Sequence, residues 1–232
     1  MTVERLAPGI WRIPTTARDR DNAFLVEADD GYTLVDVGWA KAPGQIAAAV
    51  EQLGRKPADI RRIVLTHAHP DHVQGADEMR ARTGAEILIH TADADWLRSG
   101  RVPVSGRQSA LGRLIDKVPK LHWRPTEPDR TLSGDEVIDG LKVIHTPGHS
   151  PGHIVLLHEP TRTLLVGDAV FHRSSQPKQG PAALSADSGA RDASLRRLPV
   201  DVSAVAFAHG APLAGDGVRA YADWLGSTAN GS

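Results

Sequence analysis

The chain has 232 residues, enough for one large domain, and its 41% hydrophobic and 24% charged residues are ordinary for a soluble globular protein. Its formal net charge of −1 gives no reason to expect a nucleic acid or a membrane surface as a partner. The absence of cysteine excludes disulfides, thiolate nucleophiles and iron–sulfur clusters, so histidine and carboxylate side chains must hold any bound metal.

The first half of the chain begins with strands and continues with strands that alternate with helices. Strands are predicted at residues 9–14, 22–28, 31–37, 62–65 and 86–90. Helices are predicted at residues 43–53, 73–83 and 92–97. This order suggests a mixed sheet with helices on its outer face. Because residues 1–12 lack a signal-peptide pattern and no stretch approaches the roughly 20 apolar residues of a membrane span, we expect a cytoplasmic protein.

Residues 98–124 form a basic segment without clean periodicity. Against the single acidic residue Asp116, the segment carries Arg98, Arg101, Arg107, Arg113, Lys117, Lys120 and Arg124. One interpretation is a partly helical insertion that lies over the mouth of the site as a lid and favours an anionic substrate. The other is a solvent-exposed face, because charged runs are usually solvated.

The second half of the chain repeats the pattern of strands followed by helices. Strands are predicted at residues 136–139, 141–146, 154–158, 163–166 and 204–207, and helices at 192–198 and 217–225. Residues 172–190 are predicted to form a long polar loop. Two such halves packed sheet to sheet make an α/β sandwich with helices outside. We therefore expect a single domain over residues 1–225, which includes the insertion at 98–124, and a flexible tail at 226–232.

Histidine and aspartate residues recur at the ends of the predicted strands. Three imidazoles and one carboxylate lie within residues 67–72, on a strand-to-helix loop. The candidate metal ligands are His67, His69, Asp71, His72, His149, Asp168 and His209. Strand ends on one edge of a sandwich can converge in space. Seven ligands are too many for one zinc ion but suit two metals that share a bridging carboxylate.

These ligands follow one another in an ordered pattern that covers most of the chain. The pattern is His67-x-His69-x-Asp71-His72, then Pro-Gly-His149, Gly-Asp168 and His209-Gly. It resembles the metallo-β-lactamase fold superfamily. The resemblance implies a four-layer αββα sandwich of two mixed β-sheets. It implies a first metal bound by His67, His69 and His149. It also implies a second metal bound by Asp71, His72 and His209, with Asp168 as the bridge.

Imidazole and carboxylate ligands suit zinc, with iron or manganese as alternatives. Two such ions, roughly 3.5–4 Å apart, hold a water between them and lower its pKa toward about 7, which supplies a bridging hydroxide for attack on a carbonyl or phosphoryl centre. Asp71 is the candidate catalytic residue, which would orient the hydroxide and carry a proton to the leaving group. Asp36 and His153 are candidates to hydrogen-bond the metal ligands, and His172 is a candidate to face the substrate. The remaining histidines are expected to be structural or exposed: His90, His122, His145 and His158.

The Gly-Asp168 pair and the absence of cysteine favour the branch of the superfamily that is similar to glyoxalase II, the acyl-homoserine lactonases and related thioesterases. Two departures stand out. Phe171 occupies the position where those lactonases place a tyrosine, and residues 172–175 do not match the basic glutathione-binding segment of glyoxalase II. We therefore predict a dinuclear metal-dependent hydrolase that cleaves a small ester, thioester or lactone.

Two other functions are compatible with the same pattern. One is a mononuclear iron dioxygenase of persulfides with the same fold, and the other is a non-catalytic binding protein on this scaffold. The expected partner is a small-molecule substrate, which would be anionic if the basic segment forms a lid. No nucleic-acid or membrane partner is expected. The oligomeric state is open, and a dimer is among the possibilities.

Overall fold

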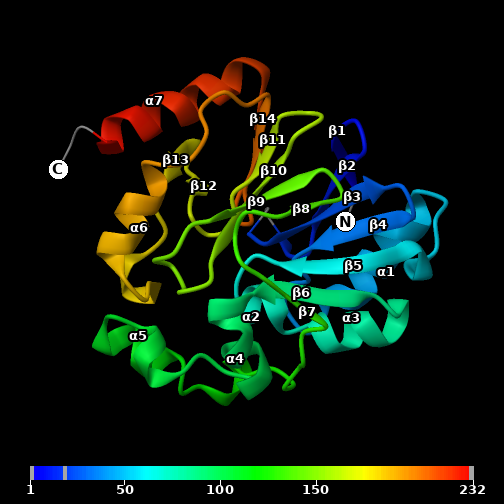
Figure 1. The fold of residues 1–232 in the computed structure, drawn as a ribbon, viewed down its shortest axis with the longest axis horizontal. Helices are drawn as coiled ribbons and strands as arrows, with labels where there is room; N and C mark the ends of the chain where they lie inside the picture. The colour runs from blue at the N-terminus through cyan, green and yellow to red at the C-terminus, as the bar shows by residue number, and fades with distance from the viewer. Residues whose placement is uncertain (1–2, 18–19, 230–232) are drawn as a thin grey trace.

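Two mixed β-sheets pack face to face in the computed structural model, which describes residues 3–17 and 20–229 (Figure 1). The strands of the first sheet lie in chain order, antiparallel from β1 to β4 and parallel from β4 to β7. They are β1 (Glu4–Ala7), β2 (Ile10–Pro14), β3 (Asn22–Ala28), β4 (Gly31–Val35), β5 (Ile60–Leu65), β6 (Glu86–His90) and β7 (Arg130–Leu132).

The second sheet has the strand order β15-β14-β11-β10-β9-β8, and only the β11–β14 pair in it is parallel among the described residues. Its strands are β8 (Val137–Ile138), β9 (Leu141–His145), β10 (Ile154–His158), β11 (Thr163–Leu165), β14 (Ala204–Ala206) and β15 (Leu213–Ala214). A separate hairpin is formed by β12 (Phe171–Arg173) and β13 (Gln176–Lys178).

Helices cover the two outer faces of this pair of sheets (Figure 1). Those on the first sheet are α1 (Ala42–Gln52), α3 (Ala76–Thr83) and α4 (Thr91–Ser99), and those on the second are α6 (Ser188–Leu195) and α7 (Val218–Ala229). The short helices are α2 (Pro70–Val73), α5 (Ala110–Ile115), η2 (Pro57–Asp59), η3 (Val104–Gly106), η4 (Pro119–Leu121), η5 (Ala182–Leu184) and η6 (Gly215–Gly217). In the described part of the chain, every helix is too short or too polar to span a bilayer.

The alternation of side chains along the central strands explains the layers. On β5, Ile63 packs toward the helices of the first sheet while Val64 packs toward the second sheet. On β10, Leu156 packs toward the first sheet while Leu157 packs beneath α6 and α7. A strand that lies between two layers must be apolar on both faces, which is why these strands appear as continuous apolar runs. Three apolar layers separate four layers of structure, and the predicted αββα sandwich is confirmed.

Several elements of the structure differ from the predictions. The segment expected to be a polar loop contains the β12–β13 hairpin, whose turn places Ser174 and Ser175 at φ angles of 53° and 60°. Serine is not the asparagine-glycine signal that usually marks such a turn. Helix α6 begins after Asp187, whose side chain accepts a hydrogen bond from the backbone N–H of Ala190. Strand β1 was not predicted, because its side chains are exposed or half-buried and lack an apolar face.

The C-terminal helix is longer than predicted. Helix α7 runs from Val218 to Ala229, so residues 226–229 belong to a helix and not to the flexible tail expected there. The apolar positions Tyr221 and Leu225 anchor this helix on the second sheet. The remainder of the predicted tail, residues 230–232, lies outside the described residues.

The basic segment 98–124 contains η3, α5 and η4 and packs against residues 182–185. Arg107 is not an exposed charge of this segment, because its guanidinium is buried and its Nε donates to Asp116 Oδ2 at 2.7 Å. Arg113 likewise donates to the carbonyl oxygens of Arg107 and Gln108. The role of the whole segment as a lid stays a prediction.

Candidate metal centre

The seven predicted ligands meet at one edge of the sandwich. Strand β5 ends at Leu65, and the loop and short helix α2 that follow carry the four ligands of residues 67–72. His149 lies in the loop after β9, Asp168 in the turn after β11, and His209 just beyond β14. The structure gathers the seven residues into two groups, in each of which the candidate ligand atoms lie within 4.8 Å of one another. The two groups are His67, His69 and His149, and Asp71, His72, Asp168 and His209.

Asp168 joins the two groups. Its Oδ2 lies 3.2 Å from Nε2 of His149 in the first group. Its Oδ1 lies 3.1 Å from Nε2 of His72 and 3.0 Å from Nε2 of His209 in the second group. One carboxylate therefore directs an oxygen toward each group, which is the arrangement that a bridging ligand requires.

The donor atoms fit a bound cation. Several buried side-chain atoms of the groups make no hydrogen bond of acceptable geometry among the described residues, although Asp168 Oδ1 lies close to His72 and His209: Nε2 of His67, His69 and His72, Nδ1 of His149, and Oδ1 of Asp168. Burying a polar atom without a partner costs about 1–3 kcal/mol, so native proteins rarely collect such atoms in one place. A divalent cation bound by imidazole and carboxylate ligands would remove part of this cost.

Charge differs between the two groups. Burial, reinforced by neighbouring cationic groups, holds the pKa values of His67 and His69 well below the usual range, so both are neutral and can donate a lone pair. Burial also lowers the pKa of His72, but the carboxylates of Asp36 and Asp168 outweigh it and raise that pKa well above the usual value. The second group is therefore the one in which carboxylates place negative charge beside the imidazoles.

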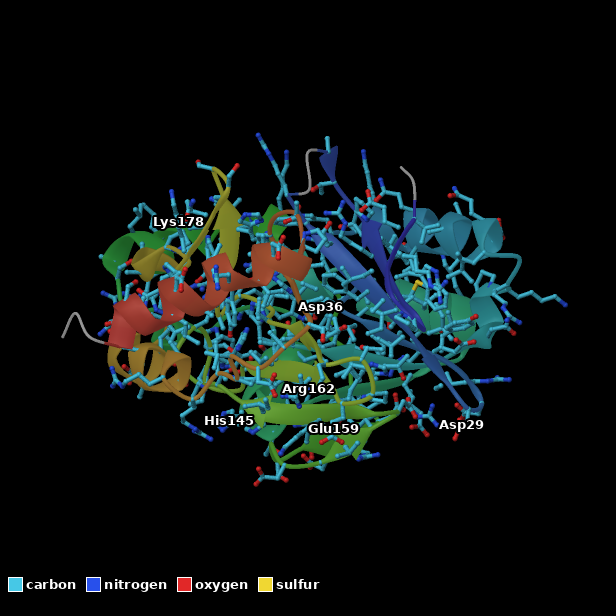
Figure 2. The ribbon with its side chains drawn as sticks, turned by 90° about the horizontal axis from the view of Figure 1, so that it is seen from above. Asp29, Asp36, His145, Glu159, Arg162 and Lys178 are labelled. Carbon is cyan, nitrogen blue, oxygen red and sulfur yellow. The ribbon has the colours of Figure 1, made fainter. Side chains whose placement is uncertain are left out.

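Asp36 holds the second group in place, as predicted for a residue that hydrogen-bonds a ligand. Its Oδ2 lies 2.8 Å from Nδ1 of His72, and its Oδ1 accepts a 2.8 Å hydrogen bond from the backbone N–H of Thr66. The residue follows β4 with a φ of 58° and is buried. Figure 2 shows Asp36 in the interior, far from the peripheral Asp29. This hydrogen bond fixes the ring orientation and tautomer of His72.

His153 acts on the backbone beside Asp168 and not on a ligand imidazole. Its Nδ1 is bonded to the Thr146 hydroxyl at 2.8 Å, and its Nε2 accepts a 2.9 Å hydrogen bond from the backbone N–H of Asp168. Burial lowers the pKa of His153 to about 3, which keeps Nε2 free to accept. Gly167 has a φ of +50°, and a Cβ there would lie 2.7 Å from His153 Nε2. Residue 167, directly before Asp168, is therefore glycine because a larger side chain would collide with His153.

Two acidic residues of the site were not predicted. Asp21 places Oδ1 3.1 Å from Nδ1 of His209. Asp93 is buried in the first turn of α4 and accepts hydrogen bonds from Ala68 N, Ser150 Oγ and Gly152 N at 3.0, 2.5 and 2.6 Å. It thus ties the loop of His67 and His69 to the loop of His149. Its position just after β6 was a signal, because other site residues also follow strand ends.

Replacing Asp93 with asparagine is expected to lower the free energy of unfolding by about 2 kcal/mol, because an amide cannot accept all three hydrogen bonds at this buried position. Because the variant loosens two ligand loops, metal affinity should fall about tenfold. Denaturant unfolding and metal titration measure the two effects. The matched control is Asp95→Asn on the exposed face of the same helix, where little change is expected. Equal stability and metal affinity of the two variants would contradict the role of Asp93.

The remaining histidines fall into two sets. His172 lines the cavity beside the centre, and its Nδ1 lies 2.6 Å from the carbonyl oxygen of Ala211. The other four have contacts away from the two groups. His90 and His145 stack with ring centroids 3.9 Å apart, His122 contacts the carbonyl of Asp116, and His158 contacts the Thr161 hydroxyl.

A cavity of about 1340 Å³ opens beside the second group of ligands. Asp71 and His209 belong to its wall, and Asp71 is the one member of that group which is not fully buried. The wall also contains Thr16, Ala17, Arg20, Asp21, Trp39, His172, Arg173, Ser174 and Gly210. A small molecule in this cavity would reach the candidate metal centre from the side of Asp71.

Several known proteins are similar in sequence to part of this chain. The uncharacterized protein YobT of Bacillus subtilis (strain 168) is 38% identical over 151 residues, which are 64% of this chain and 61% of YobT. The probable metallo-hydrolase YybB of the same organism is 34% identical over 181 residues, 78% of this chain and 69% of YybB. A hydroxyacylglutathione hydrolase of Acidiphilium cryptum (strain JF-5) is 34% identical over 161 residues, 69% of this chain and 49% of that protein. This chain therefore matches only part of the length of these relatives.

Solved structures share the fold. The metallo-beta-lactamase MIM-1 from Novosphingobium pentaromativorans superposes with a TM-score of 0.72 at 23% identity, over 99% of this chain and 88% of that chain. A metallo-beta-lactamase family protein from Thermus thermophilus gives 0.71 at 25% identity, over 97% and 81%. The family described as the metallo-beta-lactamase superfamily matches residues 18–209, so the resemblance inferred from the ordered ligands is confirmed, and the chain belongs to the metallo-β-lactamase superfamily.

Proposed function

We propose that the protein is a metal-dependent hydrolase that cleaves a small ester, thioester or lactone with two divalent cations, zinc in the first instance. The observation that carries the proposal is the position of Asp168, whose two carboxylate oxygens face different groups of histidines. Relatives with the printed names metallo-hydrolase and hydroxyacylglutathione hydrolase support a hydrolytic reaction.

In this proposal, each group of ligands holds one cation. His67, His69 and His149 would hold the first, and Asp71, His72 and His209 would hold the second, with Asp168 available to both. When bound, the cations supply Lewis-acid polarisation of a carbonyl group and activation of water at neutral pH. The buried position of six of these seven side chains excludes bulk water from the ligand atoms, which strengthens every charge interaction in the site.

Asp71 is the proposed catalytic residue. Its carboxylate lies between the buried ligands and the cavity, and its Oδ2 is 3.4 Å from Nε2 of His209. Burial raises the pKa of this carboxyl group, but His72 and His209 outweigh burial and hold that pKa below its usual value. The group is therefore ionised at neutral pH. From this position it can orient a water molecule and transfer its proton to the leaving group.

Phe171 bears on the choice among the proposed substrates. Its ring centroid lies 4.5 Å from that of His209, and the side chain is buried. A tyrosine here would place a hydroxyl near the second group, where it could hydrogen-bond a lactone carbonyl. Because phenylalanine has no hydroxyl, we favour open-chain esters and thioesters over lactones.

Metal analysis combined with a substrate panel tests the proposal. We expect two equivalents of zinc, iron or manganese per chain and hydrolysis of at least one class among esters, thioesters, lactones and phosphodiesters. A chelator should abolish the hydrolysis and lower the melting temperature, because a cation that binds only the folded protein stabilises it, and added metal should restore both. One iron per chain with oxygen uptake and no hydrolysis would instead identify a dioxygenase and overturn the proposal. Retained partner binding after metal loss, without turnover, would identify a binding protein.

A further inference from the structure

Two arginines, Arg20 and Arg173, belong to the wall of the cavity beside Asp71 and His209. Both side chains are exposed. Within residues 3–17 and 20–229, neither guanidinium forms an ion pair with a carboxylate. The guanidinium of Arg107, by contrast, is buried and paired with Asp116. The cavity wall therefore offers two cationic groups whose charge no carboxylate among the described residues neutralises.

The acidic residues of the same wall, Asp21 and Asp71, contact a histidine of the candidate metal centre. Asp21 places one oxygen 3.1 Å from Nδ1 of His209, and its other oxygen accepts a 3.1 Å hydrogen bond from Nε1 of Trp39. Asp71 lies against Nε2 of His209. Negative charge is thus directed at the imidazoles of the centre. The two guanidinium groups are left to determine which charge the cavity accepts from solvent.

Both arginines are tied to the backbone near His209. The carbonyl oxygen of Arg20 accepts a hydrogen bond from Nδ1 of His209 at 2.5 Å. The strand that carries Arg173 is attached by the bond from the backbone N–H of His172 to the carbonyl oxygen of His209. The guanidinium of Arg173 also lies 5.0 Å above the ring of Phe171, which restricts its position. The backbones of both arginines are therefore held beside His209, and the contact with Phe171 positions the guanidinium of Arg173 as well.

We propose that Arg20 and Arg173 bind an anionic group, a carboxylate or phosphate, at the end of the substrate remote from the scissile bond. Guanidinium groups are suited to such oxyanions because they donate two parallel hydrogen bonds. The inference rests on the proposed hydrolase function and narrows its substrates to acyl compounds that carry a negative charge. The basic segment 98–124 contributes no residue to the described wall of this cavity. The inference therefore assigns anion recognition to Arg20 and Arg173 and not to that segment.

A matched pair of esters tests this assignment. Mono-4-nitrophenyl glutarate and 4-nitrophenyl valerate have acyl chains of the same length and differ in the terminal carboxylate. We expect Arg20→Gln and Arg173→Gln each to raise KM for the glutarate ester about tenfold with kcat nearly unchanged, because a remote contact contributes equally to the ground state and the transition state. KM and kcat for the valerate ester should each change less than about twofold. Arg101→Gln, in the basic segment, is the exposed control and should affect neither ester.

A binding measurement separates this inference from the proposed hydrolysis. Isothermal titration of the holoenzyme with glutarate and with inorganic phosphate compares the wild type with the Arg20→Gln/Arg173→Gln double variant. Weaker binding of either anion by the double variant supports the arginine site even if no ester is hydrolysed, and the anion that loses more affinity identifies carboxylate or phosphate as the ligand. Equal affinities of the two proteins for both anions, or an equal loss for the glutarate and valerate esters, would overturn the inference.

Discussion

Replacing Asp71 with alanine is expected to lower kcat by about 10²- to 10⁴-fold, the usual contribution of a positioned acid–base group. The variant loses the carboxylate at the junction of the cavity and the buried ligands. The two nearby acids cannot replace it, because Asp168 faces both groups and Asp21 is engaged by His209 and Trp39. Steady-state kinetics on the best substrate of the ester and thioester panel provides the measurement.

The fold should survive this substitution. Asp71 is half-buried and lies in the short helix α2, while the core beneath it consists of apolar side chains such as Val73 and Ala76. Circular dichroism and thermal unfolding check this point. Asp71→Asn, which keeps an oxygen ligand but cannot accept a proton, separates metal binding from proton transfer. Asp29→Asn at the periphery is the control (Figure 2). Near wild-type turnover by Asp71→Ala would exclude the catalytic role.

Gly167→Ala should destabilise the protein by about 3 kcal/mol. The position has a φ of +50°, which L side chains rarely adopt, and the new Cβ would lie 2.7 Å from Nε2 of His153. To relieve the contact, His153 must move away from the backbone N–H of Asp168, so the shared carboxylate is displaced as well. Metal content should therefore fall together with stability. Denaturant unfolding and metal analysis of the purified variant measure both effects.

The matched control for this prediction is Gly226→Ala in α7. A Cβ at Gly226 meets no atom within 4 Å, and the residue is helical and exposed, so the same substitution should stabilise the protein by about 0.5–1 kcal/mol. The two glycine variants are thus expected to shift stability in opposite directions. If Gly167→Ala were as stable as the wild type, the steric explanation of the Gly-Asp pair would be wrong.

The parts of the site that residue type and strand position could predict are those closest to the proposed chemistry. His67, His69 and His72 are conspicuous because imidazoles rarely gather on one loop, and the strand before them is an uninterrupted apolar run. Asp36 could be predicted as a partner of a ligand because it ends another strand at the same edge. For each of these residues, the informative neighbours lie within a few positions in the sequence.

The residues that were missed act through partners distant in the sequence. Asp93 contacts loops on both sides of it in the chain, around Ala68 and Ser150, and Asp21 contacts His209. Local sequence also could not show that the charge of Arg107 is neutralised by Asp116, because a basic run gives no indication of which members fold inward. The β12–β13 hairpin was not predicted for a different reason. Its turn has two serines at positive φ, and serine is not the residue type that usually marks such a turn.

The sequence by itself determined the layered fold, the family and the candidate ligands, because apolar periodicity and the order of histidines and aspartates along the chain are local properties. The family resemblance also implied how these ligands divide around Asp168, and only the tertiary structure decided which charges remain for a substrate. Arg20 and Arg173 come from opposite halves of the chain and share a cavity wall because the β2–β3 loop and the β12–β13 hairpin both bond to His209. Their relation depends on contacts between distant segments, which no local pattern in the sequence encodes.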